Sequence, residues 1–154
     1  MNKKAFTLVE LIIVIVLVGI IAVYVAPKIT TSGFQDSADV DSFISNIRFT
    51  QHKSMVTGGG WKITFDVANN EYVIYDRTGS PATLPADKNP VEVKSGLSSV
   101  KDEDGTDITD IYFDFFGTPA LNQSCTNLLT KKVYVKISSY TIVVEPNSGG
   151  IYVQ

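Results

Sequence analysis

Cysteine is almost absent from this sequence: a single residue, Cys125, occurs in 154 positions. One cysteine cannot form a disulfide bond within its own chain, which excludes an internal disulfide framework. Its neighbours Gln123, Ser124 and Thr126 are uncharged. A catalytic thiol needs a basic, histidine-bearing environment that stabilises the thiolate. The sequence therefore favours a loop cysteine without a catalytic function.

Histidine is equally scarce, because His52 is the only one in the chain. It lies in a stretch expected to be helical, with Ser54 close by, and nothing around it resembles a nucleophile motif. The favoured interpretation is a solvated helix residue. We therefore expect no catalytic residue, no metal ligand and no cofactor, and the protein is predicted not to be an enzyme.

The sequence also lacks an excess of basic residues, since 13 Lys and Arg face 16 Asp and Glu for a net charge of −3. Proteins that bind nucleic acid usually present concentrated basic faces. The composition therefore does not favour nucleic acid as a partner. Three lysines near the C-terminal end, Lys131, Lys132 and Lys136, leave contact with DNA as a weaker alternative.

Acidic residues are concentrated in one short stretch, Asp102–Asp107, with the sequence DEDGTD. Calcium is bound by six to eight oxygen ligands, which such loops can provide. The stretch lacks the glycine position and the terminal glutamate of an EF-hand loop. An acidic, solvated turn is the favoured interpretation, and a calcium-binding loop is the alternative.

What the sequence does have is an apolar run over residues 6–26, preceded by Lys3 and Lys4. As a helix the run would be about 30 Å long at about 1.5 Å per residue, enough to cross a bilayer core. It is longer than the apolar part of a secretory signal, and no small-residue cleavage site follows it. The two lysines predict that the N-terminus stays in the cytoplasm and that the rest of the chain lies outside it.

One charged residue, Glu10, interrupts this apolar run. A carboxylate in the middle of a membrane helix costs about 2.5–3.5 kcal/mol on insertion scales, and less near the end of the helix. Two interpretations follow. Either the Glu10 side chain reaches the membrane surface, or it pairs with a cation.

The residues from Lys3 to Glu10, KKAFTLVE, resemble the processing motif of type IV prepilins and type II secretion pseudopilins. The resemblance implies that prepilin peptidase cuts between Ala5 and Phe6, and that the new amine of Phe6 is methylated. It also implies that the retained helix assembles into a fibre with other pilin or pseudopilin subunits. The new amine can then pair with Glu10 of a neighbouring subunit. Where the family usually has glycine before the cut, this chain has Ala5.

A second helix is predicted over residues 29–57, because apolar side chains recur there at spacings of three and four. They are Val40, Phe43, Ile44, Ile47 and Met55. Pro27 precedes this helix and is expected either to kink one long helix or to mark the exit from the membrane. Three consecutive glycines, residues 58–60, end the helix.

The remainder, residues 58–154, is predicted to be rich in strands. Alternation in residues 110–116 places Ile111, Phe113 and Phe115 on one buried face. Asn69 and Asn70 favour a hairpin turn. The other predicted strands cover residues 61–67, 71–76, 91–94, 98–101, 132–138, 140–145 and 151–153. The fold class is therefore α+β, a long helix packed on an antiparallel sheet.

This order of elements is similar to type IV pilin-like proteins, and in particular to the minor pseudopilins called GspH/FimT-like. The expected segments are a leader (1–5), a transmembrane and assembly helix (6–28), an amphipathic helix (29–57) and a β-rich domain (58–154). The expected protein is a minor pilin or pseudopilin in the inner membrane, crossing it once, with its domain periplasmic or extracytoplasmic. The alternative is a pilin-like module that displays a domain for binding DNA or a secreted substrate.

Overall fold

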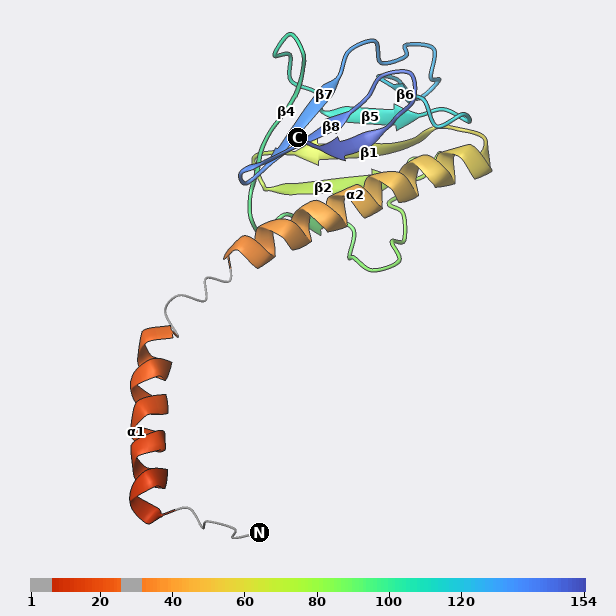
Figure 1. Cartoon of the computed structure of the whole chain (residues 1–154). Coiled ribbons are helices and arrows are strands. Elements are labelled where there is room, and N and C mark those ends of the chain that lie inside the picture. Colours follow the sequence, from red (N-terminus) through yellow and green to blue (C-terminus); the bar gives the residue numbers. More distant parts are fainter. Residues whose placement is uncertain (1–6, 26–31) are drawn as a thin grey trace, which may run out of the picture. The chain divides into compact units, whose positions relative to one another are not determined.

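The structure, a computed structural model, describes residues 7–25 and 32–154. It divides into two units, Met1–Gly33 and Phe34–Gln154. The first unit contains helix α1 (Leu8–Val25), and helix α2 (Ser32–Thr57) begins at the boundary (Figure 1). The predictions for Ala5, Phe6 and Pro27 lie outside the described residues, as do both ends of the predicted 6–28 segment.

Helix α2 packs one face on the core of the second unit. Val40, Phe43 and Ile47 on this face are at most 4% exposed, which confirms the predicted apolar face for these three. Met55, expected on the same face, is 47% exposed. The helix ends at Gly58–Gly60, each with φ between 89° and 90°, because a left-handed backbone is accessible to glycine without steric cost. The Gly59 amide donates to the Ser54 carbonyl at 2.7 Å and closes the last turn.

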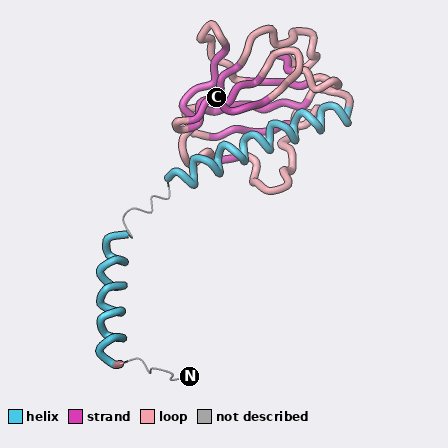
Figure 2. The backbone as a smooth tube through the Cα atoms, viewed as in Figure 1, coloured by secondary structure: helices cyan, strands magenta, loops and turns pink. Residues whose placement is uncertain are grey.

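The strands, magenta in Figure 2, form two antiparallel sheets rather than the single sheet that the sequence predicted. The first sheet has the order β3-β2-β1-β5-β6, and the second has the order β4-β7-β8-β9. The predicted hairpins are confirmed, since β1 pairs with β2 and β7 pairs with β8. The strands are β1 (Trp61–Asp66), β2 (Glu71–Tyr75), β3 (Val91–Glu92), β4 (Leu97–Asp102), β5 (Asp110–Phe113), β6 (Pro119–Ala120), β7 (Val133–Ile137), β8 (Tyr140–Val144) and β9 (Ile151–Val153).

Strand β5 ends earlier than the alternating pattern indicated. Ile111 and Phe113 are fully buried as predicted, but Phe115 is 56% exposed. The reason is Asp114, whose Oδ1 accepts hydrogen bonds from the amides of Phe116 (2.8 Å) and Thr118 (2.7 Å). These bonds turn the chain out of the sheet at Asp114. The chain then returns as β6.

The core of the second unit lies between α2 and the buried faces of the strands. The ring of Phe43 is 5.3 Å from that of Tyr72 and 6.1 Å from that of Phe65, measured between centroids. Beside it, Asn46 donates to the Tyr72 hydroxyl at 2.9 Å and to Asp87 Oδ2 at 2.7 Å. Burial raises the pKa of Tyr72 to about 12. This polar cluster joins α2 to β2 and to the loop that precedes β3.

The second unit is expected to fold without the first. Its buried apolar side chains all come from residues 40–144, so truncation at Gly33 removes none of them. A protein that begins at Gly33 should be soluble, monomeric at micromolar concentration and cooperative in thermal unfolding. Circular dichroism and light scattering would check this. A broad, sloping melting curve would show instead that the domain depends on the N-terminal helix.

Candidate functional site

Helix α1 is apolar on every side. Its large apolar side chains between Leu8 and Ile21 are from 47% to 74% exposed. A helix that is apolar all round is normally covered, either by protein or by lipid. The chemistry of this segment is therefore that of a contact surface and not of a reaction centre.

No helix in residues 7–25 or 32–154 has the length and hydropathy of a membrane-crossing segment.

The first turn of α1 places Glu10 at the third helical position after Thr7. Thr7 Oγ1 accepts a hydrogen bond from the Glu10 amide at 3.2 Å, and the Thr7 carbonyl accepts from the Leu11 amide at 3.2 Å. Thr7 therefore caps the helix, and Thr-x-x-Glu is the sequence signature of a capping box. A carboxylate in this turn also interacts favourably with the positive end of the helix dipole. Sequence reasoning had not identified this cap, although the signature was visible.

This geometry adds a local role to the two predicted for Glu10. Its side chain is exposed at the N-terminal end of α1. Here the helix itself presents unpaired amides and a partial positive charge. Phe6, the predicted source of a cationic amine, lies outside the described residues. The pairing of Glu10 with a neighbouring amine therefore remains a prediction.

In the acidic stretch Asp102–Asp107, three of the four carboxylates have partners within the chain. Asp102 Oδ1 accepts from the amides of Asp104 and Thr106, each at 2.9 Å. The hydrogen bond from Thr106 is the main cause of the lowered pKa of Asp102. Asp104 pairs with Lys131, and Asp107 pairs with Lys101 at 3.1 Å. Among the described residues no group of three or more His, Cys, Asp or Glu is placed to hold a metal ion. The arrangement supports the solvated turn.

The C-terminal lysines are partly neutralised as well. Lys131 pairs with Asp104, and this hydrogen bond raises the pKa of Lys131. Lys132 lies 2.8 Å from Glu145 and is also bonded to the Tyr152 hydroxyl, which raises its pKa and lowers that of Glu145. Both lysines are therefore occupied by groups of this chain. Lys136, the third lysine of the predicted group, is exposed on β7.

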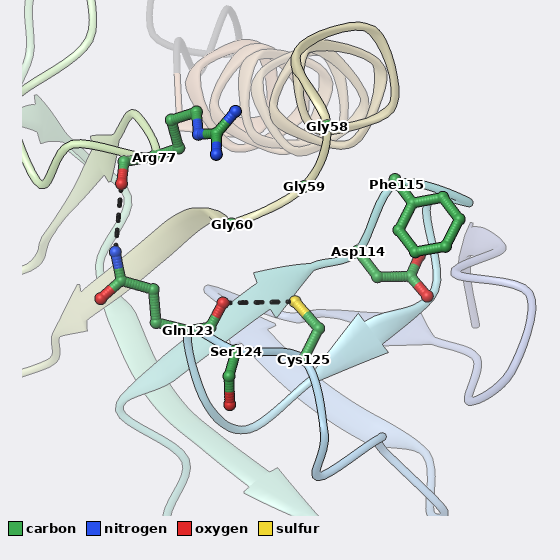
Figure 3. Close-up of a pocket in the computed structure, with 9 residues that line it drawn as sticks. All are labelled: Gly58, Gly59, Gly60, Arg77, Asp114, Phe115, Gln123, Ser124 and Cys125. Atoms are coloured by element: carbon green, nitrogen blue, oxygen red, sulfur yellow. Dashed lines mark hydrogen bonds between the residues drawn. The ribbon is translucent and has the colours of Figure 1, made fainter.

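Cys125 lines a pocket of about 240 Å³ between the end of α2 and the loop that follows β6 (Figure 3). Its thiol donates to the Gln123 carbonyl at 3.6 Å, and burial raises its pKa. A raised pKa disfavours the reactive thiolate. Arg77 lies across the pocket and donates to the Thr57 carbonyl at 2.8 Å.

His52 is exposed on α2. The structure does not bring His52 and Cys125 together in this pocket.

Comparison with known proteins gives one match. Residues 1–26 match the family model described as the prokaryotic N-terminal methylation motif. The motif fits the prepilin signal of type IV pilin-like proteins, whose members are generally structural. It implies a membrane anchor, processing by prepilin peptidase and assembly with other pilin subunits. No curated protein and no solved structure matches the chain. The α+β architecture is compatible with a pilin-like fold.

Proposed function

We propose that this protein is a minor pilin or pseudopilin, a structural subunit that assembles through its N-terminal helix into a type IV pilus or a type II secretion pseudopilus. The observation that carries the proposal is the methylation motif over residues 1–26. A second observation supports it: α1 exposes apolar side chains on all sides, and a fibre of packed helices would cover them.

In this proposal each segment has a distinct task. Residues 1–5 are the leader, which prepilin peptidase removes, and the new amine of Phe6 is methylated. Residues 6–28 first hold the precursor in the inner membrane and then pack in the fibre. Pro27 supplies a bend where the helix leaves the packed region. The domain stays on the extracytoplasmic side, since Lys3 and Lys4 hold the N-terminus in the cytoplasm.

The proposed processing step predicts a defined mature mass. Protein isolated from its native host should lack residues 1–5 and carry one added methyl group on Phe6. Ala5 has a small side chain, so the peptidase site that usually takes glycine before the cut can also accept it. Intact-mass spectrometry with sequencing of the N-terminal peptide would measure both changes.

Two variants strengthen this test. Replacing Ala5 with Leu should leave uncleaved precursor in the membrane, because the peptidase would have to accommodate a larger side chain at the position before the cut. Replacing Asn2, further from the cut, should leave processing unchanged. A mature chain that still begins at Met1 would refute the proposed function.

A further inference from the structure

A groove of about 270 Å³ runs between α2 and the loop that joins β2 to β3. We refer to it as the α2 groove. Its α2 wall includes Asp41, Asn46 and Phe49, and its loop wall is formed by Pro85–Asp87. In Figure 1 this loop lies beside α2. The α2 groove is separate from the Cys125 pocket, with which it shares no lining residue.

The α2 groove carries two negative charges that nothing in the described part of the chain neutralises. Asp41 is exposed and Asp87 is half-buried, and neither forms an ion pair with a described residue. No lysine or arginine is among the residues that line the groove. Lys88, next to Asp87 in the sequence, is exposed, and Lys53 lies 5.5 Å from the centroid of the Phe49 ring without lining the groove. The groove therefore has a net negative lining.

The Asp87 carboxylate is held in position by neutral donors. Its Oδ2 accepts a hydrogen bond from the Ser42 hydroxyl and another from the Asn46 side-chain amide, each at 2.7 Å. Asn46 is only 4% exposed and also donates to the Tyr72 hydroxyl at 2.9 Å. Within the described residues no hydrogen bond reaches Oδ1 of Asp87. Neutral donors fix the position of the carboxylate, and its charge is left for a cation to balance.

Both walls of the groove are already fixed by contacts within the domain. The Phe49 ring meets the Trp61 ring edge-on, with 6.1 Å between the centroids. The loop is anchored by Asn89, whose side-chain amide donates to the carbonyls of Ile74 (2.7 Å) and Ala82 (2.9 Å). A ligand that enters a preformed groove orders few protein groups, so little conformational entropy is lost on binding.

An arginine or lysine side chain matches this combination of groups. Its alkyl stem covers apolar surface, here that of Phe49, Pro85 and Ala86, while its cationic head stays close to charged groups. A divalent metal ion fits less well, because calcium needs six to eight oxygen ligands. Among the described residues no group of three or more His, Cys, Asp or Glu is placed to hold a metal ion. An anion would be repelled by both carboxylates.

We propose that the α2 groove binds the side chain of an arginine or lysine presented by a segment of a partner protein. The cationic head pairs with Asp87, and Asp41 adds a second, more exposed negative charge. The apolar walls exclude water from the stem and strengthen the ion pair. This inference goes beyond the proposed function and does not depend on it, because the groove lies entirely within the second unit.

A pair of short peptides would test the chemistry of the groove. The full-length protein in detergent micelles is titrated with N-acetyl-Gly-Arg-Gly-amide and followed by amide NMR shifts. The matched peptide carries citrulline, which has nearly the shape of arginine but no charge. The arginine peptide should shift the amides of Ser45 and Ala86 and bind about tenfold more tightly, since hydrogen bonds between charged groups are the strong ones. Equal affinity of the two peptides, or shifts that map to another part of the domain, would overturn the inference.

Two variants separate charge from shape. Asp87→Asn keeps an oxygen for Ser42 and Asn46 to donate to, and it should weaken binding of the arginine peptide by about tenfold. Asp41→Asn changes an exposed residue and should weaken binding by about two- to threefold. Thermal melting would verify that both proteins are folded.

Glu103→Gln is the matched control for these variants. Glu103 is exposed and lies outside the groove, and its replacement makes the same change in net charge. Binding of the arginine peptide should stay unchanged in this variant. Equal loss of binding in Glu103→Gln and Asp87→Asn would show that only the overall charge attracts the peptide, and it would overturn the inference.

Photo-cross-linking in the native host would identify the partner. Ala86 is exposed at the groove and is replaced with p-benzoylphenylalanine. The adduct should join this chain to another protein, beside an arginine or lysine in the linked segment, and should be lost when Asp87→Asn is added. An adduct with a second copy of this chain, an adduct that persists in Asp87→Asn, or the absence of any adduct would each overturn the inference.

Discussion

Glu10→Gln is expected to lower incorporation of the protein into fibres by at least about tenfold while leaving leader cleavage intact. Glutamine keeps the shape of the side chain and remains compatible with the capping box at Thr7. It removes only the negative charge. If the methylated amine of a neighbouring Phe6 pairs with Glu10 in an apolar surround, loss of one partner costs on the order of 2–5 kcal/mol. Fibre content and intact mass would be measured together.

Thr7→Ala is the matched control for this variant. It removes the hydrogen bond from Thr7 Oγ1 to the Glu10 amide but keeps the carboxylate. Loss of a helix cap typically costs about 1 kcal/mol, so a smaller effect on assembly is expected. Cross-linking between cysteines in adjacent N-terminal helices would report the stagger of the subunits. Unchanged cross-linking and fibre content in Glu10→Gln would leave the interpretation that Glu10 only reaches the membrane surface.

Phe43→Ala is expected to lower the free energy of unfolding of the second unit by about 3–5 kcal/mol. Phe43 is fully buried, and its ring contacts those of Phe65 and Tyr72. Truncation removes these contacts and leaves a cavity between α2 and β2. Domains are stable by only about 5–15 kcal/mol, so the loss is a large part of the total. Urea denaturation of the protein that begins at Gly33, followed by Trp61 fluorescence, would measure it.

Phe34→Ala provides the control on the same helix. Phe34 is 77% exposed, and the same substitution there should change the free energy of unfolding by less than about 0.5 kcal/mol. Equal effects of the two substitutions would contradict the burial of Phe43 and the packing of α2 on the first sheet. A shallower urea dependence in either variant would indicate a change in the denatured ensemble.

Much of the fold was predictable from local patterns. The spacing of Val40, Phe43 and Ile47 identified the buried face of α2, since helical periodicity is a local property of the chain. Paired asparagines and alternating side chains identified the β1–β2 hairpin for the same reason. The motif from Lys3 to Glu10 pointed to the prepilin signal, and a match over residues 1–26 agrees with it. Each of these signals is contained within a few consecutive residues.

The position of Phe115 shows where local patterns stop being sufficient. The alternating pattern of side chains predicted Phe115 on the buried face. Asp114 instead accepts hydrogen bonds from two backbone amides, and the chain turns before Phe115 can reach the core. Met55 was likewise expected inside, but it is 47% exposed, and it is the neighbouring Ser54 that is fully buried and donates to the Phe113 carbonyl of β5. In both cases hydrogen bonds of the folded chain accompany the outcome, and periodicity does not contain them.

What the sequence alone determined is therefore the N-terminal signal, the two helices and the main hairpins, because their causes are local. The tertiary structure decided the division of the strands into two sheets, since the pairing of β1 with β5 and of β4 with β7 joins segments far apart in the chain. The tertiary structure also decided which charged side chains form ion pairs. Lys131 reaches Asp104, and Lys132 reaches Glu145, only because the folded backbone brings them together. Coulomb attraction depends on distance in space and not on separation in sequence.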